Sequence, residues 1–222
     1  MPRRLYFVVL LLACVSGSAH DVISTNLTWS REVSRIVYHH CASCHGPAGK
    51  AMSLMTYEEA RPWAKAIRDE VLARRMPPWD AVKGVGDFAN DPSLSQPEMD
   101  VLVGWVEGGA PEGNPAYLPE MPRAQSPKPA VTHTRIDLRK SLTLDREILL
   151  AAIAPAGPVE VTALLPDQSV ERLLWVREFR PKWKRTYSLR TPLKLPRGTQ
   201  LLVYCSECTG SVKATVFTTP LR

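Results

Sequence analysis

Five residues near the start of the chain constrain its fold more than any other feature: Cys41-Ala42-Ser43-Cys44-His45. Two cysteines three positions apart, followed at once by a histidine, have the C-x-x-C-H spacing by which a c-type haem is attached. The two thiols add to vinyl groups on one side of the porphyrin, and the next residue places an imidazole under the iron. The pattern therefore predicts a covalent haem held by Cys41 and Cys44, with His45 as the proximal iron ligand.

Two other interpretations of a C-x-x-C pair are a redox disulfide and half of a zinc site. A redox disulfide is expected within a βαβ pattern, which the surrounding sequence lacks. A zinc site needs a second ligand pair, and the candidate pair, Cys205 and Cys208, lies far along the chain in a different kind of sequence. His45 and an export signal upstream favour haem over both.

The first 19 residues have the form of a secretory signal peptide. An apolar run follows Arg3 and Arg4, and small residues end the segment, with cleavage expected after Ala19. The apolar run is too short for a permanent transmembrane helix. The sequence around Cys14 also resembles a lipoprotein cleavage box, so a lipid tether through Cys14 is an alternative. We therefore expect a periplasmic or secreted protein, with lipoprotein anchoring as the variant of that prediction.

The charge of the chain bears on its partners. The formal net charge is +6, and loss of Arg3 and Arg4 with the signal peptide leaves 26 basic and 22 acidic residues, a net charge of +4. The basic residues are spread along the chain without a stripe or interleaved aromatic residues, so nucleic-acid binding is not expected. A mild positive excess suits an acidic redox partner protein instead.

A methionine on a proline-rich loop is the predicted distal iron ligand. After a capping box at Thr56–Glu59, a helix is expected to start near Pro62 and to end before Met76-Pro77-Pro78. The residue before a proline is disfavoured in the α region, so Met76 should lie in a stiff loop, where its thioether can reach the iron. Met55 is the main alternative ligand, whereas Met99 is expected in the apolar core.

Helical periodicity predicts the other elements of the first 113 residues. Ser30 is a plausible N-cap for a helix that leads into the haem motif, and Ser95–Glu98 forms a second capping box before an amphipathic helix. The segment Asp80–Pro92, which follows the Met76 loop and precedes this second capping box, is expected to be a loop. We expect His39 and His40 to be ordinary surface or packing residues.

Together these segments resemble a small class I cytochrome c domain. They resemble more closely the cytochrome c domain of secreted bacterial proteins that carry a copper type II, ascorbate-dependent monooxygenase-like region. The matching stretches are residues 41–45, 52–54, 60–65, 75–79 and 108–113. The resemblance implies an all-α haem domain over residues 26–113.

Beyond this domain the character of the sequence changes. Residues 114–133 are rich in proline and are expected to form an extended, semi-rigid linker. Residues 134–222 contain about seven short alternating runs separated by turns, which suggests an antiparallel β-sandwich. The expected fold is therefore multidomain: an all-α cytochrome c domain followed by a small antiparallel β-sandwich domain. Cys205 and Cys208 are predicted to form a disulfide at a strand end, with free thiols as the alternative.

Short stretches of residues 134–222 resemble the C-terminal β domain of those copper monooxygenases. The matching stretches are residues 187–189, 192–193 and 195–199. The resemblance implies a fold but argues against copper chemistry, because residues 134–222 contain no His and no Met to bind copper. Where the family carries a His-x-His pair, this chain has Pro166-Asp167-Gln168-Ser169.

The sequence thus predicts an exported monohaem cytochrome that exchanges electrons with an unidentified partner protein through a haem ligated by His45 and Met76. The protein is expected to be an electron carrier rather than a catalyst, and no residue is predicted to be catalytic. The β domain is expected to serve docking or structure, and its removal should leave the haem spectrum intact. The alternative is that the haem donates electrons to a copper monooxygenase-like oxidoreductase activity, although a bound copper ion is not expected.

Overall fold

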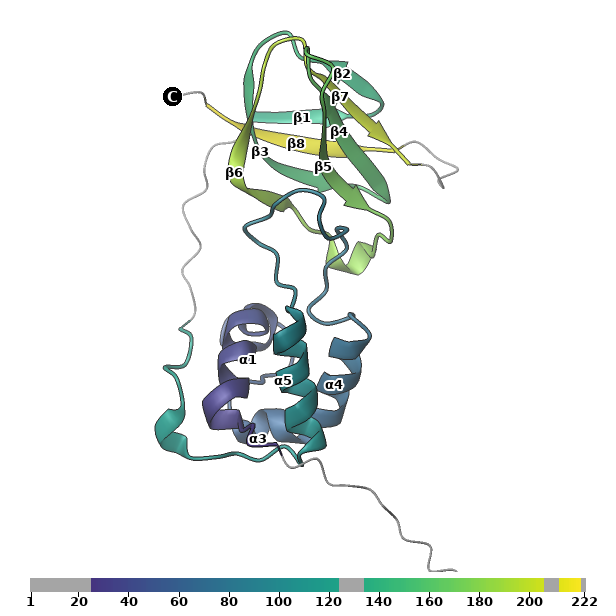
Figure 1. Cartoon of the computed structure of the whole chain (residues 1–222). Helices are drawn as coiled ribbons and strands as arrows, with labels where there is room; N and C mark the ends of the chain where they lie inside the picture. The colour runs from purple at the N-terminus through teal and green to yellow at the C-terminus, as the bar shows by residue number, and fades with distance from the viewer. Residues whose placement is uncertain (1–24, 124–133, 206–211, 221–222) are drawn as a thin grey trace, which may run out of the picture.

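A computed structural model describes residues 25–123, 134–205 and 212–220. The helices gather at one end of the molecule and two β-sheets at the other, and a long loop between two helices reaches the sheets (Figure 1). Helix and strand each make up 28% of the described residues, so the fold is mixed α/β. The predicted signal peptide, with Cys14 and Ala19, lies outside the described residues, as does Cys208.

The helical end consists of short elements. In chain order they are η1 (Trp29–Val33), α1 (Ser34–His40), α2 (Ala42–His45), α3 (Tyr57–Ala60), η2 (Arg61–Trp63), α4 (Ala64–Leu72), α5 (Gln96–Glu107) and η3 (Pro115–Tyr117). Both predicted capping boxes are confirmed, at Thr56 with Glu59 and at Ser95 with Glu98. The first helix begins earlier than expected, because the Thr28 side chain, rather than Ser30, accepts a hydrogen bond from the backbone N–H of Arg31.

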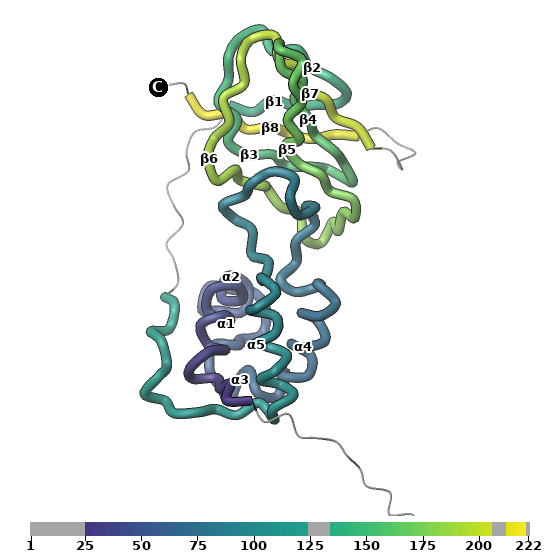
Figure 2. The backbone as a smooth tube through the Cα atoms, viewed as in Figure 1, coloured from purple at the N-terminus to yellow at the C-terminus, as the bar shows by residue number. Residues whose placement is uncertain are grey.

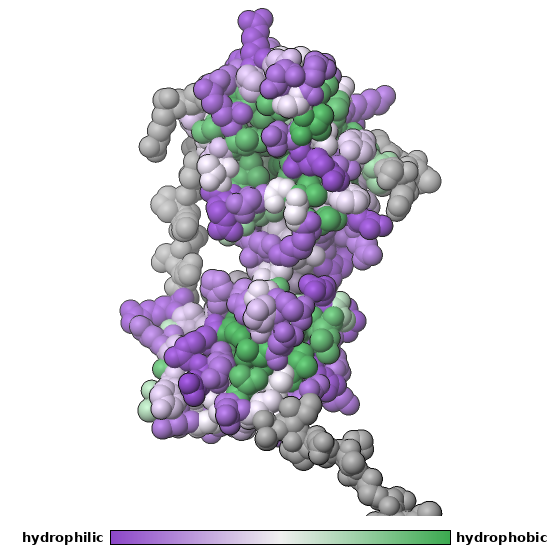
Figure 3. Space-filling model, in the orientation of Figure 1, coloured by the Kyte–Doolittle hydropathy of each residue, from purple (hydrophilic) through white to green (hydrophobic). Residues whose placement is uncertain are grey.

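The helices pack around a small apolar core. Trp29 of η1 and Trp105 of α5 are almost fully buried, with ring centroids 6.1 Å apart, and they join the first helices to α5. The other buried apolar residues of this core are Val33, Ile36, Val37, Leu54, Met55, Ala60, Ala64, Val71, Leu94, Met99, Leu102 and Ala110. Apolar side chains also gather on the visible surface of this end (Figure 3).

The strands form two antiparallel four-stranded sheets. Their bounds are β1 (Thr134–Leu138), β2 (Ser141–Thr143), β3 (Ile148–Pro155), β4 (Val159–Leu164), β5 (Val170–Val176), β6 (Tyr187–Leu195), β7 (Gln200–Tyr204) and β8 (Ala214–Thr219). One sheet has the order β1-β8-β3-β6 and the other β2-β7-β4-β5. Alternating residues such as those of β8, with Ala214, Val216 and Thr218 buried, point into a shared core, as the period of two requires. By these strand orders, β1 and β6 are the edge strands of one sheet, and β2 and β5 are those of the other.

The prediction of an all-α domain followed by a separate β-sandwich is wrong. The segment from Ala81 to Phe88, expected to be a loop of the helical domain, instead pairs with two of these edge strands, β5 and β6. Ala81 forms an antiparallel bridge with Val176 of β5, and Phe88 forms one with Leu189 of β6. Both Ala81 and Phe88 are buried in the core of the sandwich. The physical reason is that open sheet edges leave backbone groups unpaired, and this loop pairs with some of those on β5 and β6.

Among the described residues, no helix has the length and apolar character needed to cross a membrane. Cys205, which directly follows β7, is disulfide-bonded.

Candidate haem site

The C-x-x-C-H residues lie where α1 gives way to α2, at the part of the helical end that faces the sandwich (Figure 2). The N–H of Cys41 still bonds to the carbonyl of Val37 (2.9 Å), which ends α1. The Cys41 carbonyl then accepts the N–H of Cys44 (3.1 Å) and the N–H of His45 (2.8 Å). One turn of backbone therefore carries both thiols and the imidazole, and neither cysteine is disulfide-bonded.

The orientation of the His45 ring is set by one hydrogen bond. Its Nδ1 lies 2.8 Å from the backbone carbonyl oxygen of Met52. A carbonyl only accepts hydrogen bonds, so Nδ1 carries a proton, and in the neutral ring Nε2 then has the lone pair. Histidines that ligate metals are oriented in this way, with the second ring nitrogen donating to a carbonyl or carboxylate.

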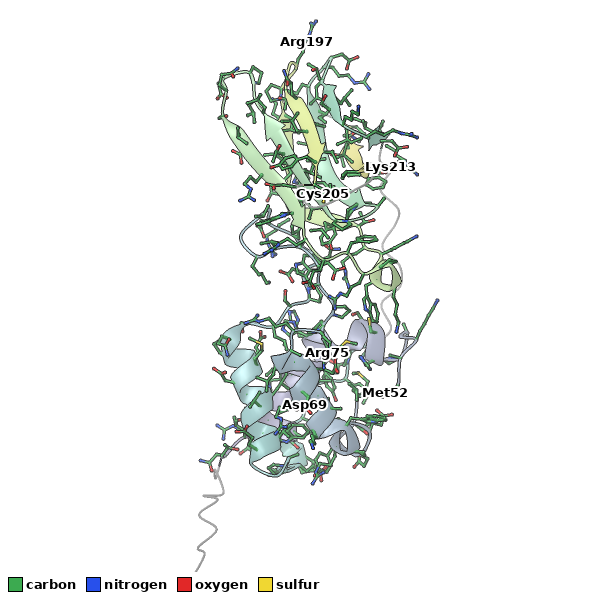
Figure 4. All side chains as sticks on the ribbon, turned by 90° about the vertical axis from the view of Figure 1, so that its right-hand side faces the viewer. Met52, Asp69, Arg75, Arg197, Cys205 and Lys213 are labelled. Carbon is green, nitrogen blue, oxygen red and sulfur yellow. The ribbon has the colours of Figure 1, made fainter. Side chains whose placement is uncertain are left out.

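A tight loop brings the Met52 carbonyl to His45. The N–H of Ala51 bonds to the Cys44 carbonyl (3.1 Å), and the N–H of Leu54 bonds to the His45 carbonyl (3.1 Å), so the chain doubles back over α2. A Cβ at Gly49 would lie 1.9 Å from the Cys44 carbonyl oxygen, so the turn requires glycine there. The Met52 side chain points to the outside of the molecule (Figure 4).

The thiol of Cys41 is not tuned for redox exchange. Burial, with a smaller contribution from the neighbouring Cys44, raises its pKa to about 12. Disulfide oxidoreductases lower the pKa of the attacking thiol instead, because the thiolate is the nucleophile. This environment does not fit the redox interpretation of the C-x-x-C pair.

The zinc interpretation also lacks a partner site. Cys205 is disulfide-bonded and so is not a thiolate ligand. Within residues 25–123, 134–205 and 212–220, no three His, Cys, Asp or Glu side chains converge as a metal site would require. The donor set at α2 fits haem attachment, which uses the two cysteines covalently and a single histidine on the iron.

Met76 lies outside the helix, as predicted, four residues after the end of α4. Its side chain is half-buried and lines a cavity of about 170 Å³ together with Val71, Leu94 and Met99. His45 is not among the residues that line this cavity. The structure therefore places the two predicted axial ligands on separate elements and does not itself bring them into contact.

The two other methionines weighed as ligands differ from Met76 in their surroundings. The Met55 side chain is 3% exposed and belongs to the helical core, and its carbonyl accepts the Tyr38 hydroxyl (2.8 Å). Met99 is 5% exposed and belongs to the same core, as expected from its position on the apolar face of α5. Of these three methionines, Met76 is therefore the one that is half-buried, whereas Met55 and Met99 are buried in the helical core.

His40 is a packing residue, as predicted, but its bonds are specific. Its ring is buried, with Nδ1 2.9 Å from the Pro92 carbonyl and Nε2 2.8 Å from Oε1 of Glu98. Glu98 also closes the capping box of α5 with Ser95. His40 therefore ties the end of α1 to the start of α5, beside Cys41.

The position at which the copper family carries a His-x-His pair is a turn. Residues 165–169 join β4 to β5, and Asp167 Oδ1 accepts hydrogen bonds from the backbone N–H of Ser169 (2.9 Å) and its hydroxyl (2.6 Å). These contacts account for Asp167 and Ser169 as turn-forming residues.

Sequence reasoning missed the contacts between the methionine loop and the sandwich. Trp79, Asp80, Arg180 and Arg185 take part in them, over separations of about one hundred residues. The only signal was indirect: a tryptophan directly after two prolines, and a basic segment at 177–185 that no strand pattern explains.

No protein-family model matches the chain, and no curated protein resembles it significantly.

Proposed function

We propose that this protein is an exported, monohaem c-type cytochrome that transfers single electrons. Cys41 and Cys44 would hold the haem through thioether bonds, His45 would be the proximal iron ligand and Met76 the distal one. The observation that carries the proposal is the His45 ring. Its Nδ1 is hydrogen-bonded to the Met52 carbonyl at 2.8 Å, so Nε2 is the nitrogen that would bind iron. His45 directly follows Cys44, and neither Cys41 nor Cys44 is disulfide-bonded.

Haem c, when bound, supplies reversible one-electron chemistry at its iron. The residues of this chain would set the conditions for it. His45 is held in one tautomer by Met52, and a thioether from Met76 would raise the reduction potential, because it favours ferrous iron. If both His45 and Met76 held the iron, the haem would supply electron transfer rather than a binding site for substrate.

The electron-transfer partner is proposed to be an acidic protein of the same compartment. The chain carries a formal net charge of +6, and it would keep a positive excess after loss of the predicted signal peptide. Opposite charges speed the encounter of redox partners, and the rate then falls as salt screens them.

Haem attachment is tested first. The full chain would be expressed in a bacterial strain competent for cytochrome c maturation, and haem would be stained after denaturing electrophoresis. The wild type and the Ser43→Ala control should stain, because Ser43 is one of the two intervening residues of the motif. The double variant Cys41→Ser/Cys44→Ser should not stain, since it has no thiol left for thioether bonds. An unstained wild type in that strain refutes the proposal.

The distal ligand is tested separately. Ferric haem with sulfur ligation has a weak near-infrared charge-transfer band, which Met76→Ala should abolish. Met55→Ala and Met99→Ala are matched controls that should keep the band and lose about 2–5 kcal/mol of stability, because both side chains are buried. Loss of the band in Met55→Ala but not in Met76→Ala would reassign the ligand.

Metal analysis distinguishes this function from a copper-dependent one. The purified protein should contain about one iron atom and no stoichiometric copper. Stoichiometric copper together with ascorbate-dependent substrate oxidation would favour the monooxygenase-like alternative instead.

A further inference from the structure

The loop that carries Met76 continues directly into the β-sandwich. The N–H of Val82 bonds to the carbonyl of Trp175 (2.7 Å), and the N–H of Ala89 bonds to the carbonyl of Ser188 (2.8 Å). Asn90 adds two bonds through its amide, which donates to the Thr186 carbonyl (2.7 Å) and accepts the Ser188 N–H (3.0 Å). This part of the loop is therefore built into the sheet edges.

The residues between Met76 and the sheet edges are held by side chains of the sandwich. Arg185 donates a hydrogen bond from Nη2 to the Pro78 carbonyl (3.0 Å), and its guanidinium carbon lies 5.4 Å from the centre of the Trp79 ring. The Trp79 ring also packs edge-on against Tyr187 (4.8 Å) and Phe88 (5.8 Å). The carbonyl of the second residue after Met76 is thus fixed by a residue more than one hundred positions away.

An ion pair with Arg180 holds Asp80, the residue after Trp79. Arg180 donates from Nε to Asp80 Oδ1 (2.6 Å), and its backbone N–H bonds to Asp80 Oδ2 (3.2 Å). The Asp80 carboxylate is only 6% exposed, so it depends on Arg180 for its pairing. The Asp80 carboxylate also helps raise the pKa of Tyr187 to about 12, after burial as the main cause.

On its other side, Met76 is anchored to α4. The backbone N–H groups of Met76 (3.3 Å) and Arg75 (3.0 Å) bond to the Glu70 carbonyl, and the Arg75 side chain pairs with the Glu70 carboxylate. Met76 therefore spans two supports, the end of α4 and the sandwich. Pro77 and Pro78 add stiffness between them, since proline fixes the backbone φ angle.

We propose that the β-sandwich positions the distal ligand: Arg185, with Arg180, holds Pro78–Asp80 so that Met76 stays on the haem iron. This inference rests on the proposed function. It assigns the sandwich a role at the haem site and reverses the sequence-based expectation that the haem spectrum would survive removal of residues 134–222. Arg180 and Arg185 are positioning residues, because they act through the loop rather than on the haem.

The test uses the full-length holoprotein and imidazole, which binds ferric haem only when the distal methionine leaves. In Arg185→Met, the hydrogen bond to Pro78 and the cation over Trp79 are lost. Imidazole affinity should then rise about tenfold, the factor that loss of one hydrogen bond of ordinary strength carries. The reduction potential should fall, and Arg185→Lys should restore part of both values. Arg197→Met is the matched control, because Arg197 lies at the far end of the sandwich from the helices (Figure 4).

A second measurement separates loop release from unfolding. Hydrogen exchange should speed up in residues 73–80 of Arg185→Met and stay unchanged in α5. Wild-type imidazole affinity in a folded Arg185→Met overturns the inference alone, provided that Met76→Ala raises that affinity. If Met76→Ala leaves the affinity unchanged, Met76 is not the ligand, and both the distal assignment and this inference fail.

Discussion

Two segments leave the helical end, and they differ in what they contact. Residues 114–123 run over the surface of the helices, where the Tyr117 carbonyl accepts a hydrogen bond from Arg35 (3.1 Å) and the side chains of Tyr117, Leu118 and Met121 are exposed. Residues 79–91 instead enter the sandwich, where Ala81 and Phe88 join its core.

The difference shows that proline content is a poor guide to which of the two segments packs into the sandwich. Proline marks residues 114–133 as a linker, yet Pro77 and Pro78 directly precede the segment whose Ala81 and Phe88 are buried in the sandwich core. The two segments differ in the residues that come after their prolines. Trp79 and Phe88 each bring a large apolar ring, whose burial stabilises the fold. The next predictions test this comparison, from the largest expected effect to the smallest.

Phe88→Ala should cause the largest loss of stability. The Phe88 ring is 5% exposed and packs against Trp79 and Tyr187, so truncation removes buried area and leaves a cavity. We expect the free energy of unfolding to fall by about 3–5 kcal/mol, as measured by chemical denaturation. Leu118→Ala, on the exposed segment, is the control and should change it by less than about 0.5 kcal/mol. Equal effects of the two variants would erase the distinction between the segments.

Asp80→Ala should come next. Removing the carboxylate leaves the Arg180 guanidinium, which is 34% exposed, without its partner and frees the loop at one point. We expect a loss of about 2–4 kcal/mol by thermal or chemical unfolding, at the lower part of the range for a buried pair because Arg180 reaches solvent. A loss under about 0.5 kcal/mol would mean that Asp80 and Arg180 behave as a surface pair.

The starts of two helices could be predicted from the sequence. The capping boxes at Thr56–Glu59 and Ser95–Glu98 are local signals that fix helix starts, and C-x-x-C-H is local too. The position of Met76 outside the helix follows from the proline after it. The short alternating runs likewise indicated antiparallel strands.

The pairing of Ala81 with Val176 and of Phe88 with Leu189 could not be predicted in the same way. It joins residues about one hundred positions apart, and it depends on which strands end at the sheet edges. The sequence of residues 79–91 has glycines and aspartates that are typical of a loop. Nothing local in it indicates that it will pair with the edge strands of a sheet. The hydrogen bond between His45 and the Met52 carbonyl was missed for a similar reason, because a carbonyl has no sequence signature.

Glu98 gives a smaller, pH-dependent effect at the helical end. Burial opposes ionisation, but hydrogen bonds from Ser95 and His40 outweigh it and lower the pKa of Glu98 to about 2 from an ordinary value of 4.5. A lowered carboxyl pKa stabilises the fold above the unfolded value, and that stability is lost as the pH falls from about 4.5 toward 2. We expect Glu98→Gln to lose about 1–2 kcal/mol at pH 7 and to show a flatter stability profile between pH 5 and 2.

The smallest effect is expected at the exposed end of residues 114–123. Arg123 and Glu120 form an ion pair of 2.5 Å, shorter than the Arg180–Asp80 bond, yet their side chains are 88% and 77% exposed. Water screens both charges and already solvates them, so the short distance adds little free energy. Glu120→Gln should therefore change the free energy of unfolding by less than about 0.5 kcal/mol, and high salt should shrink even that difference from wild type. If Glu120→Gln instead destabilised the protein as much as Asp80→Ala, distance rather than burial would govern these pairs, and the proline-rich segment would be a second structural support.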